Sequence, residues 1–365
     1  MKIRYYISGH GLGHASRSCH ILSTLKSIAP DLEVEVSSPA QRWFLDNMLQ
    51  KTPLVSTRSW DIGVIQHDSL QLDLPATIAA TKALYRQHDQ LLEAEAADLK
   101  SAGVSLVVCD IPPLPLAAAE RAGIPSVAIG NFDWEWIYRG LAADQPEHAS
   151  ELLELAEQCA DDYRRATLML RLPMASPCAS FSNREDVPLV ARQARCSKSQ
   201  TRKQLGIAAG KKIALLSFGG FGIQQLELAP LALLDDWVFL CEQELDLTLP
   251  NLYRLRSGEY FYPDLVAASD VVITKPGYGI VSEAIANHCA VLYTPRGNFP
   301  EEPLLLTALK RYTRCRKISN EQLRRGDWQQ PLAELLATPA HEATLATNGA
   351  EVVAARLAEL AGVAV

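Results

Sequence analysis

Residues 274–305 read TKPGYGIVSEAIANHCAVLYTPRGNFPEEPLL, and they indicate the fold class more clearly than any other stretch of the chain. A β-branched apolar run ends at Lys275, a Pro-Gly-Tyr-Gly loop follows, and a helical pattern begins at Val281. A second apolar run then ends in a loop that leads into another helical pattern at Glu301. Strands and helices that alternate at this spacing are typical of a parallel sheet covered by helices on both faces.

The same alternation extends through both halves of the chain. Apolar runs that are predicted as strands lie at 2–7, 32–38, 105–110, 125–131, 212–220, 236–242, 251–256, 270–277 and 290–297. Stretches that are predicted as helices lie at 15–29, 81–103, 115–123, 263–270, 280–288, 301–312 and 343–362. Between the two series, residues 183–204 are charged and polar, which is typical of a linker that leads into the first helix of a new unit.

We therefore expect an α/β protein with two Rossmann-like, doubly wound domains that face each other across a cleft. The first domain is predicted at residues 1–184, the second at 185–345, and a C-terminal helix that packs back on the first domain at 346–365. Ligands of such sheets bind beyond the carboxyl ends of the strands. The loops that follow the strands are therefore the places where functional residues are expected.

The composition excludes several classes of protein. The 365 residues carry a net charge of −7 and the pI is about 5.7, so no broad basic face for nucleic acid is expected. The eight cysteines are scattered without a CxxC pair, which argues against a disulfide framework or a zinc site and favours a reducing compartment. No apolar run approaches the roughly 20 residues that cross a bilayer, and no secretory leader is expected. We expect a cytoplasmic protein.

The loop after the first strand, SGHGLGHASR at residues 8–17, contains two histidines between glycines. Gly11 and Gly13 allow a tight turn and a close approach of a ligand to the backbone, and the helix that follows favours an anionic group at its start. His10 and His14 then either cap the turn, bind a metal ion as a pair, or supply a general base. No HExxH pattern or obvious carboxylate partner follows, so we expect no metal and favour His14 as the base.

Two further strand ends in the first half carry polar or aromatic side chains. Asp110 ends the strand at 105–110, where it either orients a histidine, acts as a base itself, or caps the helix that begins near Pro115. The segment after the next strand, GNFDWEWIYRG, brings Asn131, Trp134 and Trp136 together. Aromatic faces with interleaved polar groups suit recognition of a sugar or an acceptor, and they equally suit core and rim packing.

The strand ends of the second half are rich in glycine and in charged residues. Small residues that are predicted to seat a diphosphate there are Gly219, Gly220, Gly277, Gly279 and Ser282. Lys275 supplies a counter-charge, and Glu283, one turn into the predicted helix, is placed to bind the hydroxyls of a ribose. Glu301 and Glu302, at the next helix start, either accept sugar hydroxyls or complement the helix dipole.

These motifs together resemble those of GT-B glycosyltransferases, and the nearest resemblance is to the glycosyltransferase-like N-terminal domain of plant L-arabinokinases. It rests on ISGHGLGHASR, SLVVCDIPP, IPSVAIGNFDWEWIY, LRLP, DVPLV, SFGG, YFYPDLVAASD, KPGYGIVSEA and NFPEEP, which together run over nearly the whole chain. A more distant similarity, at the level of motifs, is to the peptidoglycan lipid-intermediate N-acetylglucosaminyltransferase and to plant natural-product glycosyltransferases.

The resemblance implies that the first domain binds the acceptor and that the second holds the nucleotide sugar. It implies that Glu283 binds the ribose, that His14 lies near the acceptor and the donor phosphate, and that Arg192 contacts the diphosphate. Asp110 is implied to pair with a histidine. The pair that reads the sugar is Glu301–Glu302 in this chain. The plant relative is fused to a sugar kinase, and this chain is expected to act alone or with a separate partner.

The resulting expectation is a metal-independent, inverting transfer of a sugar from a nucleoside diphosphate, UDP by preference, to an acceptor hydroxyl. The nucleotide sugar is a co-substrate, no cofactor is expected, and the acceptor is a small molecule, a lipid-linked sugar or a glycan. Two alternatives remain open. A non-hydrolysing nucleotide-sugar epimerase needs acid and base groups on both sides of the sugar, whereas a non-catalytic nucleotide-sugar-binding protein needs neither His14 nor Asp110.

Overall fold

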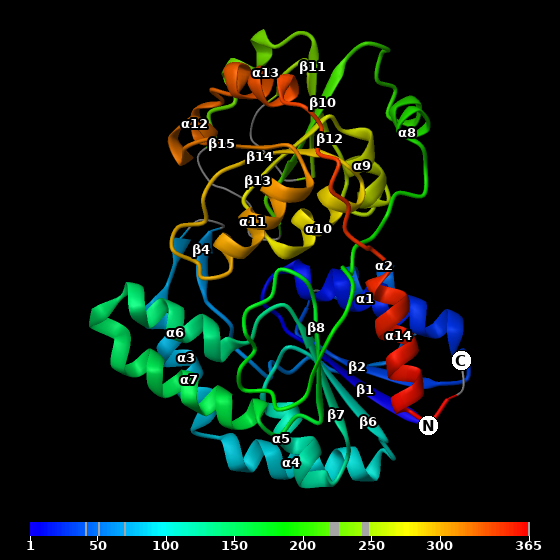
Figure 1. The fold of residues 1–365 in the computed structure, drawn as a ribbon, viewed down its shortest axis with the longest axis vertical. Helices are drawn as coiled ribbons and strands as arrows, with labels where there is room; N and C mark the ends of the chain where they lie inside the picture. The colour runs from blue at the N-terminus through cyan, green and yellow to red at the C-terminus, as the bar shows by residue number, and fades with distance from the viewer. Residues whose placement is uncertain (41, 50–51, 69–70, 220–225, 243–247, 364–365) are drawn as a thin grey trace.

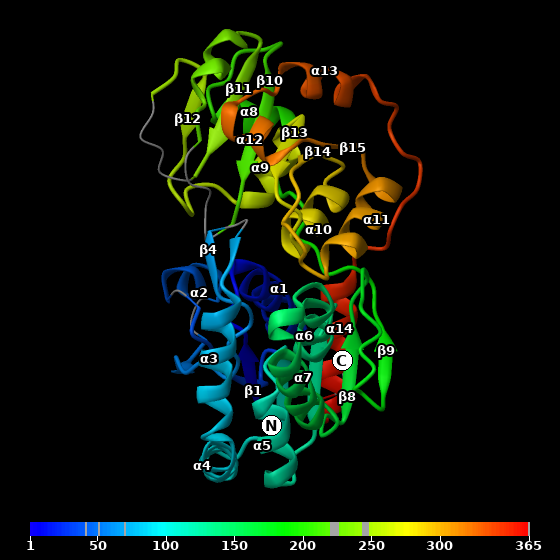
Figure 2. The same cartoon turned by 90° about the vertical axis from the view of Figure 1, so that its left-hand side faces the viewer.

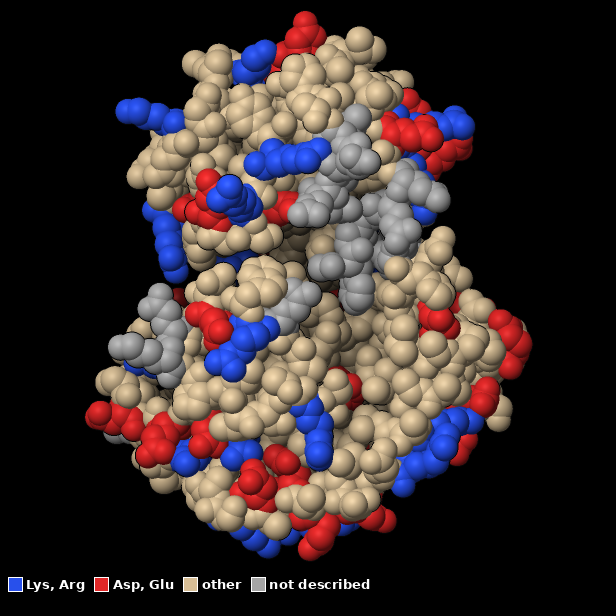
Figure 3. Space-filling model, turned by 180° about the vertical axis from the view of Figure 1, so that it is seen from behind, with Lys and Arg blue, Asp and Glu red and all other residues tan. Residues whose placement is uncertain are grey.

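The computed structural model describes residues 1–40, 42–49, 52–68, 71–219, 226–242 and 248–363. The chain forms two lobes, each built on one parallel sheet, and the lobes lie one above the other in Figures 1 and 2. The α/β class that the alternating pattern predicts is confirmed. The surface drawn in Figure 3 narrows where the lobes meet, and Lys and Arg side chains are interspersed there with Asp and Glu side chains.

The sheet of the first lobe has the strand order β3-β2-β1-β6-β7-β8-β9, and neighbouring strands are parallel. Its strands are β1 (Lys2–Ile7), β2 (Glu33–Ser37), β3 (Leu54–Ser56), β6 (Leu106–Asp110), β7 (Ser126–Gly130), β8 (Leu168–Arg171) and β9 (Arg184–Asp186). The short hairpin β4 (Gln66–Asp68) and β5 (Gln71–Leu72) stands apart from the sheet. The strands β6 and β7 are buried at every position because helices cover both faces, as their continuous apolar sequences predict.

Helices on both faces of this sheet fill the core of the first lobe. They are α1 (Leu12–Ile28), α2 (Arg42–Met48), α3 (Leu74–Tyr85), α4 (His88–Ser101), α5 (Leu114–Ala122), α6 (Trp134–Asp144), the 3₁₀ turn η1 (Pro146–His148) and α7 (Ala149–Tyr163). The last helix, α14 (Gly349–Leu360), returns to this lobe and packs on α1, and Figure 1 shows it in red beside the N-terminus. A Cβ at Gly349 would lie 2.2 Å from the carbonyl oxygen of Pro188, so only glycine fits where α14 begins.

The sheet of the second lobe has the order β12-β11-β10-β13-β14-β15, again with parallel neighbours. Its strands are β10 (Lys212–Ser217), β11 (Trp237–Cys241), β12 (Leu252–Arg254), β13 (Val271–Thr274), β14 (Ala290–Tyr293) and β15 (Cys315–Lys317). Its helices are α8 (Lys198–Gln204), η2 (Ala229–Leu233), α9 (Tyr262–Ala268), α10 (Tyr278–Ala286), α11 (Glu302–Tyr312), α12 (Asn320–Arg325) and α13 (Gln329–Ala337). Separate apolar clusters fill its two faces.

Both sheets contain a point at which the connections leave in opposite directions. In the first sheet this point lies between β1 and β6, and in the second it lies between β10 and β13. Such switch points open a crevice beyond the carboxyl ends of the strands. The loops after β1, β6, β10 and β13 therefore mark the candidate site, and these loops carry the glycines and charged residues that the sequence analysis singled out.

The two lobes also touch directly. The apolar cluster that packs α1 and α14 on the first sheet includes Tyr278 and Val281 of α10, in the second lobe. On the other side of the crevice, a Cβ at Gly140 of α6 would lie 2.5 Å from Cγ of Pro300. Only a residue without a side chain allows this approach, so Gly140 permits the close contact between α6 and the loop before α11.

Several sequence-based boundaries are wrong, each for a local reason. The expected single helix at 81–103 is two helices, α3 and α4. The break lets Tyr85 and His88 both reach Asp162 of α7, with Tyr85 Oη donating to Oδ2 at 3.0 Å and His88 Nε2 lying 2.8 Å from Oδ1. The helices α1 and α10 begin at Leu12 and Tyr278, earlier than expected, because glycines precede each of them and act as the residues at which the helices start.

The strand β9 lies across the expected domain boundary at residue 184. Its sequence is Arg-Glu-Asp, and its Arg184 and Asp186 are exposed at the edge of the first sheet. Charged edge strands of this kind prevent pairing with other chains, and they lack the apolar pattern on which strand prediction rests. The edge strand β15, with the sequence Cys-Arg-Lys, was missed for the same reason, whereas β3 and β8 were missed because runs of three or four residues are too short to show a pattern. The helix α14 begins at Gly349 rather than near residue 343.

Candidate functional site

The amino-terminal ends of α1 and α10 meet at the junction of the lobes. A Cβ at Gly279 would lie 3.7 Å from Cα of Gly13, so the two glycines place the helix starts almost in contact. Gly11 begins α1 with a φ of 72°, a conformation that favours glycine, and Gly277 begins α10. Each helix start presents backbone N–H groups without intrahelical partners, and two such ends together favour an anionic ligand.

His14 lies in the first turn of α1 and is paired with Asp110 at the end of β6. The distance from His14 Nδ1 to Asp110 Oδ1 is 2.8 Å, and the side chain of Asp110 is completely buried. Ser18 Oγ donates to Asp110 Oδ2 at 2.6 Å. Of the roles that the sequence left open for Asp110, the geometry thus matches the one of orienting a histidine. The carboxylate does not cap α5, whose first residue is Leu114.

Arg17, one turn further along α1, holds the same carboxylate from another side. Its Nε donates to Asp110 Oδ2 at 2.8 Å and its Nη2 donates to Oδ1 at 2.5 Å. Burial by itself raises the pKa of Asp110, but the guanidinium of Arg17 and the imidazole of His14 outweigh it, and the pKa lies well below its usual range. Because Asp110 is ionised, it is a strong acceptor, and in the tautomer that pairs with it the His14 ring carries its proton on Nδ1. The lone pair of Nε2 is then available to a ligand.

His10 has different surroundings from His14. Its ring packs edge-on against Trp134, with centroids 5.2 Å apart, and stacks on Phe299 of the second lobe at 6.3 Å. Burial lowers the pKa of His10 well below its ordinary value, and the positive charges of Arg296 and Lys275 act in the same direction. His10 is therefore neutral at neutral pH, and it has no carboxylate partner such as Asp110 among the contacts of the described residues.

The residues expected on the acceptor side occupy two environments. Asn131 is completely buried, where it accepts a hydrogen bond from Arg17 Nη1 at 2.9 Å and donates one to Glu301 Oε1 at 2.8 Å. Trp134 is also buried, and its Nε1 donates to Asp61 Oδ2 at 2.8 Å. Trp136 is half-buried and packs at the edge of the apolar core. The packing alternative therefore describes both tryptophans, although the ring of Trp134 also borders both histidines.

Asp61 is a buried carboxylate near the histidines that the sequence analysis did not identify. Burial raises its pKa, while hydrogen bonds from Ser8 and Trp134 oppose the rise. It lies in the irregular segment between β3 and β4, where neither periodicity nor a motif distinguishes one aspartate from another. Only the folding of this segment over the loop after β1 brings Asp61 to the site.

Asp133 provides a prediction about stability. It begins α6, where Oδ1 accepts from the backbone N–H of Trp136 at 2.8 Å, and burial raises its pKa to about 7 although that hydrogen bond opposes the rise. The folded protein therefore binds this proton more tightly than the unfolded chain does. The stabilisation is complete below the ordinary pKa of 3.8 and is lost as the pH rises through about 7.

Asp133→Asn, which keeps a good residue at the helix start, should thus raise the free energy of unfolding at pH 8 and change it little at pH 4. Urea unfolding at the two pH values measures the difference, with the exposed Asp144→Asn at the end of the same helix as the control. An equal effect of Asp133→Asn at both pH values would contradict the prediction.

On the second lobe, Glu283 is paired with Arg192. Both Nε and Nη2 of Arg192 reach Glu283 Oε1, at 2.7 and 2.6 Å, and the side chain of Glu283 is buried in the second turn of α10. Burial raises the pKa of Glu283, and Arg192 partly offsets the rise. The structure thus brings together two residues that the sequence analysis placed separately, one on the ribose and one on the diphosphate. Their mutual contact holds the carboxylate of Glu283 in one orientation.

The remaining donor-side residues lie on α10 or in the loops after β10 and β13. Lys275 lies in the loop between β13 and α10, close enough to His10 to lower the pKa of that histidine. Ser282 is buried on α10, beyond the first turn. Gly219 follows β10 with a φ of 69°, whereas Gly220 lies outside the described residues.

Glu301 and Glu302 both bind Arg296, which the sequence analysis did not single out. Glu301 Oε2 accepts from Arg296 Nη1 at 3.0 Å, and Glu302 Oε2 accepts from its backbone N–H at 2.7 Å. Arg296 Nη1 also donates to the carbonyl oxygen of Pro276 at 3.2 Å, and the guanidinium lies over the ring of Phe299. The signal for Arg296 was its position three residues after the carboxyl end of β14.

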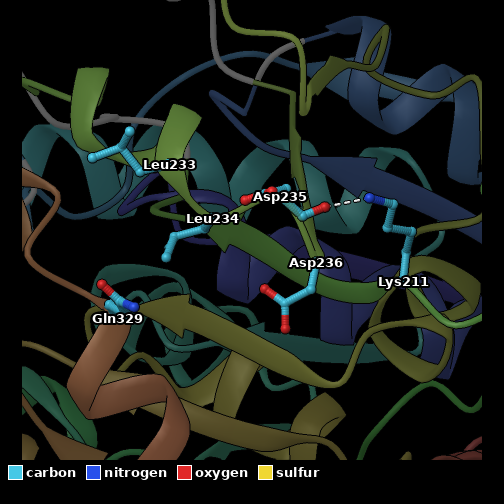
Figure 4. A pocket seen from close by; sticks show the side chains of 6 residues that line it. All are labelled: Lys211, Leu233, Leu234, Asp235, Asp236 and Gln329. Atoms are coloured by element: carbon cyan, nitrogen blue, oxygen red, sulfur yellow. Dashed lines mark hydrogen bonds between the residues drawn. The ribbon is translucent and has the colours of Figure 1, made fainter.

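Two hollows of about 490 Å³ each lie on the surface of the described residues. One lies at the junction of the lobes and is lined by Leu72, Leu74, Pro75, Leu141, Gln145, Glu147, His148, Arg296, Gly297 and Asn298. The other, shown in Figure 4, is lined by Lys211, Leu233, Leu234, Asp235, Asp236 and Gln329. Because Lys211 and Asp236 precede β10 and β11, this second hollow is at the amino-terminal edge of the sheet, opposite the edge at which ligands of such sheets bind.

The described part of the chain lacks two kinds of feature. No group of three or more His, Cys, Asp and Glu side chains there is arranged to hold a metal ion. Among the helices that the structure describes, none is both long and apolar enough to cross a membrane.

Comparison with known proteins identifies the fold. No protein-family model matches the chain. The chain is 32% identical over 362 residues, 98% of its length, to the L-arabinokinase of Arabidopsis thaliana, and it spans 34%, about a third, of that relative. The glycosyltransferase of kitacinnamycin has a similar structure, with a TM-score of 0.62, 17% identity, and coverage of 99% of this chain and 96% of that chain. MurG of Acinetobacter baumannii is similar with a TM-score of 0.58, 14% identity, and coverage of 98% of this chain and 99% of that chain.

These relatives confirm the resemblance predicted from the motifs, both to L-arabinokinase and to GT-B glycosyltransferases. The likeness to the two solved structures extends over both lobes, since nearly the whole of each chain is covered. The likeness covers both parallel sheets and the switch point of each sheet. The chain therefore has the GT-B fold of glycosyltransferases.

Proposed function

We propose that the protein transfers a sugar from a nucleoside diphosphate to an acceptor hydroxyl, with the first lobe binding the acceptor and the second binding the donor. The observation that carries the proposal is the buried His14–Asp110 pair, which lies beside the contact between the starts of α1 and α10. In this proposal the pair supplies a general base and the helix starts supply a site for an anionic leaving group within one crevice, and glycosyl transfer needs both.

In the proposed reaction, His14 Nε2 removes the proton of the acceptor hydroxyl. The acceptor oxygen attacks the anomeric carbon of the donor from the face opposite the diphosphate, so that the new C–O bond forms as the old one breaks and the configuration inverts. The electron pair of the broken bond leaves with the nucleoside diphosphate. Asp110 stabilises the imidazolium that forms on His14, because the carboxylate lies 2.8 Å from Nδ1 and remains ionised.

The diphosphate is proposed to lie against the backbone N–H groups at the start of α10, with Gly277 and Gly279 allowing its close approach and Ser282 on the same helix. Lys275 and the start of α1 at Gly11 and Gly13 add positive charge around the leaving group. Fixed cations and helix ends thereby supply the stabilisation that a divalent ion supplies in other transferases, which is the basis for proposing a metal-independent reaction without a cofactor.

Glu283 is proposed to accept hydrogen bonds from the ribose, with Arg192 fixing the direction of its carboxylate. The sugar itself is proposed to lie near Glu301 and Glu302, and UDP is the proposed nucleotide on the basis of the motif resemblance. The junction hollow lined by Leu74 and Leu141 is the proposed entrance for the acceptor. Its first-lobe side combines apolar side chains with the polar Gln145, Glu147 and His148, and its second-lobe side is polar at Arg296 and Asn298. The eight cysteines are scattered along the chain without a CxxC pair, which supports the proposal of a reducing compartment such as the cytoplasm.

Glu283→Ala is expected to weaken binding of the nucleoside diphosphate by about tenfold or more, because one hydrogen bond to a charged group contributes about 1.5–3 kcal/mol. Isothermal titration calorimetry with the nucleotide measures the effect. Glu351→Ala, which removes an exposed glutamate from α14, is the matched control and should leave the affinity unchanged. Unchanged affinity of the Glu283→Ala variant for every nucleoside diphosphate would exclude the ribose assignment.

The proposed function is tested in two steps. A thermal-shift screen of UDP-, GDP-, dTDP- and ADP-sugars identifies the donor, because a ligand that binds the folded state raises the melting temperature by mass action. Isotopically labelled donor is then incubated with and without candidate acceptors. Release of nucleoside diphosphate that depends on acceptor supports transfer, scrambling of the sugar without acceptor identifies an epimerase, and binding with neither reaction identifies a binding protein.

A further inference from the structure

We propose that Arg17 is a positioning residue that makes the competence of His14 as a base depend on contact between the two lobes. The inference rests on the proposed function for its consequence, and on the contacts of buried side chains for its mechanism. These contacts run without interruption from His14 in the first lobe to Arg296 in the second.

The contacts form a relay across the junction. His14 Nδ1 lies 2.8 Å from Asp110 Oδ1, and Arg17 binds both oxygens of Asp110 through Nε and Nη2. The remaining Arg17 nitrogen, Nη1, donates to Asn131 Oδ1 at 2.9 Å. Asn131 Nδ2 then donates to Glu301 Oε1 at 2.8 Å, and Glu301 Oε2 accepts from Arg296 Nη1 at 3.0 Å.

All six side chains of this relay are buried: His14, Arg17, Asp110, Asn131, Glu301 and Arg296. Its two guanidinium groups balance its two carboxylates in charge, so the relay as a whole needs no further counter-ion. In such surroundings each hydrogen bond is strong, and a group that loses its partner is destabilised by more than a surface group is. The arrangement of the relay is therefore expected to change as a unit.

Arg17 is the residue of the relay that is connected to the second lobe by two separate contacts. Its Nη1 reaches Glu301 through Asn131, and its guanidinium lies over the ring of Tyr278 at the start of α10, 5.1 Å from the centroid. Separation of the lobes removes both contacts at once, because Tyr278 and Glu301 belong to the second lobe. The hydrogen bonds to Asp110 then remain as the contacts that hold the guanidinium in place.

The position of Arg17 matters because its Nε and Nη2 fix both oxygens of Asp110, and with them the oxygen that faces His14 Nδ1. While the relay holds the guanidinium against Asp110, the carboxylate accepts the Nδ1 proton and Nε2 keeps its lone pair. A guanidinium that is released from Asn131 and Tyr278 holds the two oxygens of Asp110 less firmly. Oδ1 is then a poorer acceptor for the Nδ1 proton, the Nε2-protonated form of the ring gains population, and the base is weakened. His14 would thus deprotonate a hydroxyl only while the lobes are in contact. While the lobes are apart, it would not activate water, and the donor would be protected from hydrolysis.

Two substitutions test the inference from opposite lobes. Arg17→Lys keeps the positive charge beside Asp110, and it removes both the reach to Asn131 and the second nitrogen that binds the carboxylate. Tyr278→Leu removes the aromatic face from the second lobe, and Tyr278→Phe is its matched control because it keeps the ring. Nitrogen-15 NMR of histidine-labelled protein reports which nitrogen of His14 carries the proton, and circular dichroism confirms that each variant is folded.

The expected result is a rise in the Nε2-protonated form of His14 in Arg17→Lys and in Tyr278→Leu, with Tyr278→Phe resembling the unmodified protein. The kcat for transfer should fall by about tenfold or more in the same two variants while the Kd for the donor changes by less than about twofold. An unchanged His14 spectrum together with an unchanged kcat in both variants would overturn the inference. Because the NMR measurement requires no turnover, a protein that shows the tautomer change and transfers no sugar would disprove the proposed function alone.

Discussion

His14→Gln should lower kcat for glycosyl transfer by about 10²- to 10⁴-fold and leave the Kd for the donor nearly unchanged, since a positioned general base contributes an effect of this size. His14 has the one imidazole at the junction that pairs with a buried, ionised carboxylate among the described residues. Glutamine keeps a hydrogen-bonding side chain of similar length and cannot accept a proton at neutral pH. Initial rates and donor titrations on the same preparation separate the two parameters.

Two other histidines serve as controls for this prediction. His67→Gln changes an exposed imidazole and should leave kcat unaltered. His10→Gln alters a ring that packs between Trp134 and Phe299, and its effect on kcat should be smaller than that of His14→Gln. If His10→Gln instead removed as much activity as His14→Gln or more, the assignment of the base to His14 would be wrong.

Asp110→Asn should lower the free energy of unfolding by about 3–5 kcal/mol and also lower kcat. The large effect on stability follows from the burial of Arg17, whose guanidinium would lose its carboxylate partner in surroundings without water. The effect on kcat follows from the His14 tautomer, because an asparagine amide cannot fix the ring proton on Nδ1 as an ionised carboxylate does. Urea unfolding and initial rates measure the two effects.

The comparison variant is Asp186→Asn, which removes an exposed partner of Arg171 at the edge of the first sheet. Exposed ion pairs contribute about 0–1 kcal/mol, so this variant should be almost as stable as the unmodified protein. A change of less than about 1 kcal/mol in Asp110→Asn as well would show that Arg17 finds another partner or reaches water. The buried relay would then not have the energetic importance assigned to it here.

Together the two predictions separate the chemical role of His14 from the structural role of its partner. His14→Gln should affect kcat far more than stability, since Nε2 makes no hydrogen bond to another described residue. Asp110→Asn should affect both quantities, because its carboxylate binds His14, Arg17 and Ser18 at the same time. This difference distinguishes a catalytic group from the residue that positions it.

The fold class was predictable because the sequences of the central strands indicate that both faces of these strands are buried. Sequences such as LVVCD and SVAIG are apolar except at one end, and a strand of this kind is stable only where helices cover both faces of a parallel sheet. Edge strands such as β9 escape prediction because one of their faces meets water and tolerates charge. Helix breaks such as the one at Arg86–Gln87 escape it because their cause, the shared contact of Tyr85 and His88 with Asp162, lies about 75 residues away in the chain.

In the candidate site, too, some features were predictable from the sequence and others were not. Glycines, strand ends and helix starts are local features, and the sequence by itself therefore placed His14, Asp110, Glu283 and the glycines of both loops at the carboxyl edges of the sheets. The tertiary structure alone decided three other features of the site. These are the pairing of Glu283 with Arg192, the position of Asp61 beside Trp134, and the relay from Asp110 to Arg296. Each of those contacts joins residues from separate elements of the fold. The sequence shows the chemistry of each side chain, but the partner of that side chain is known only once the chain has folded.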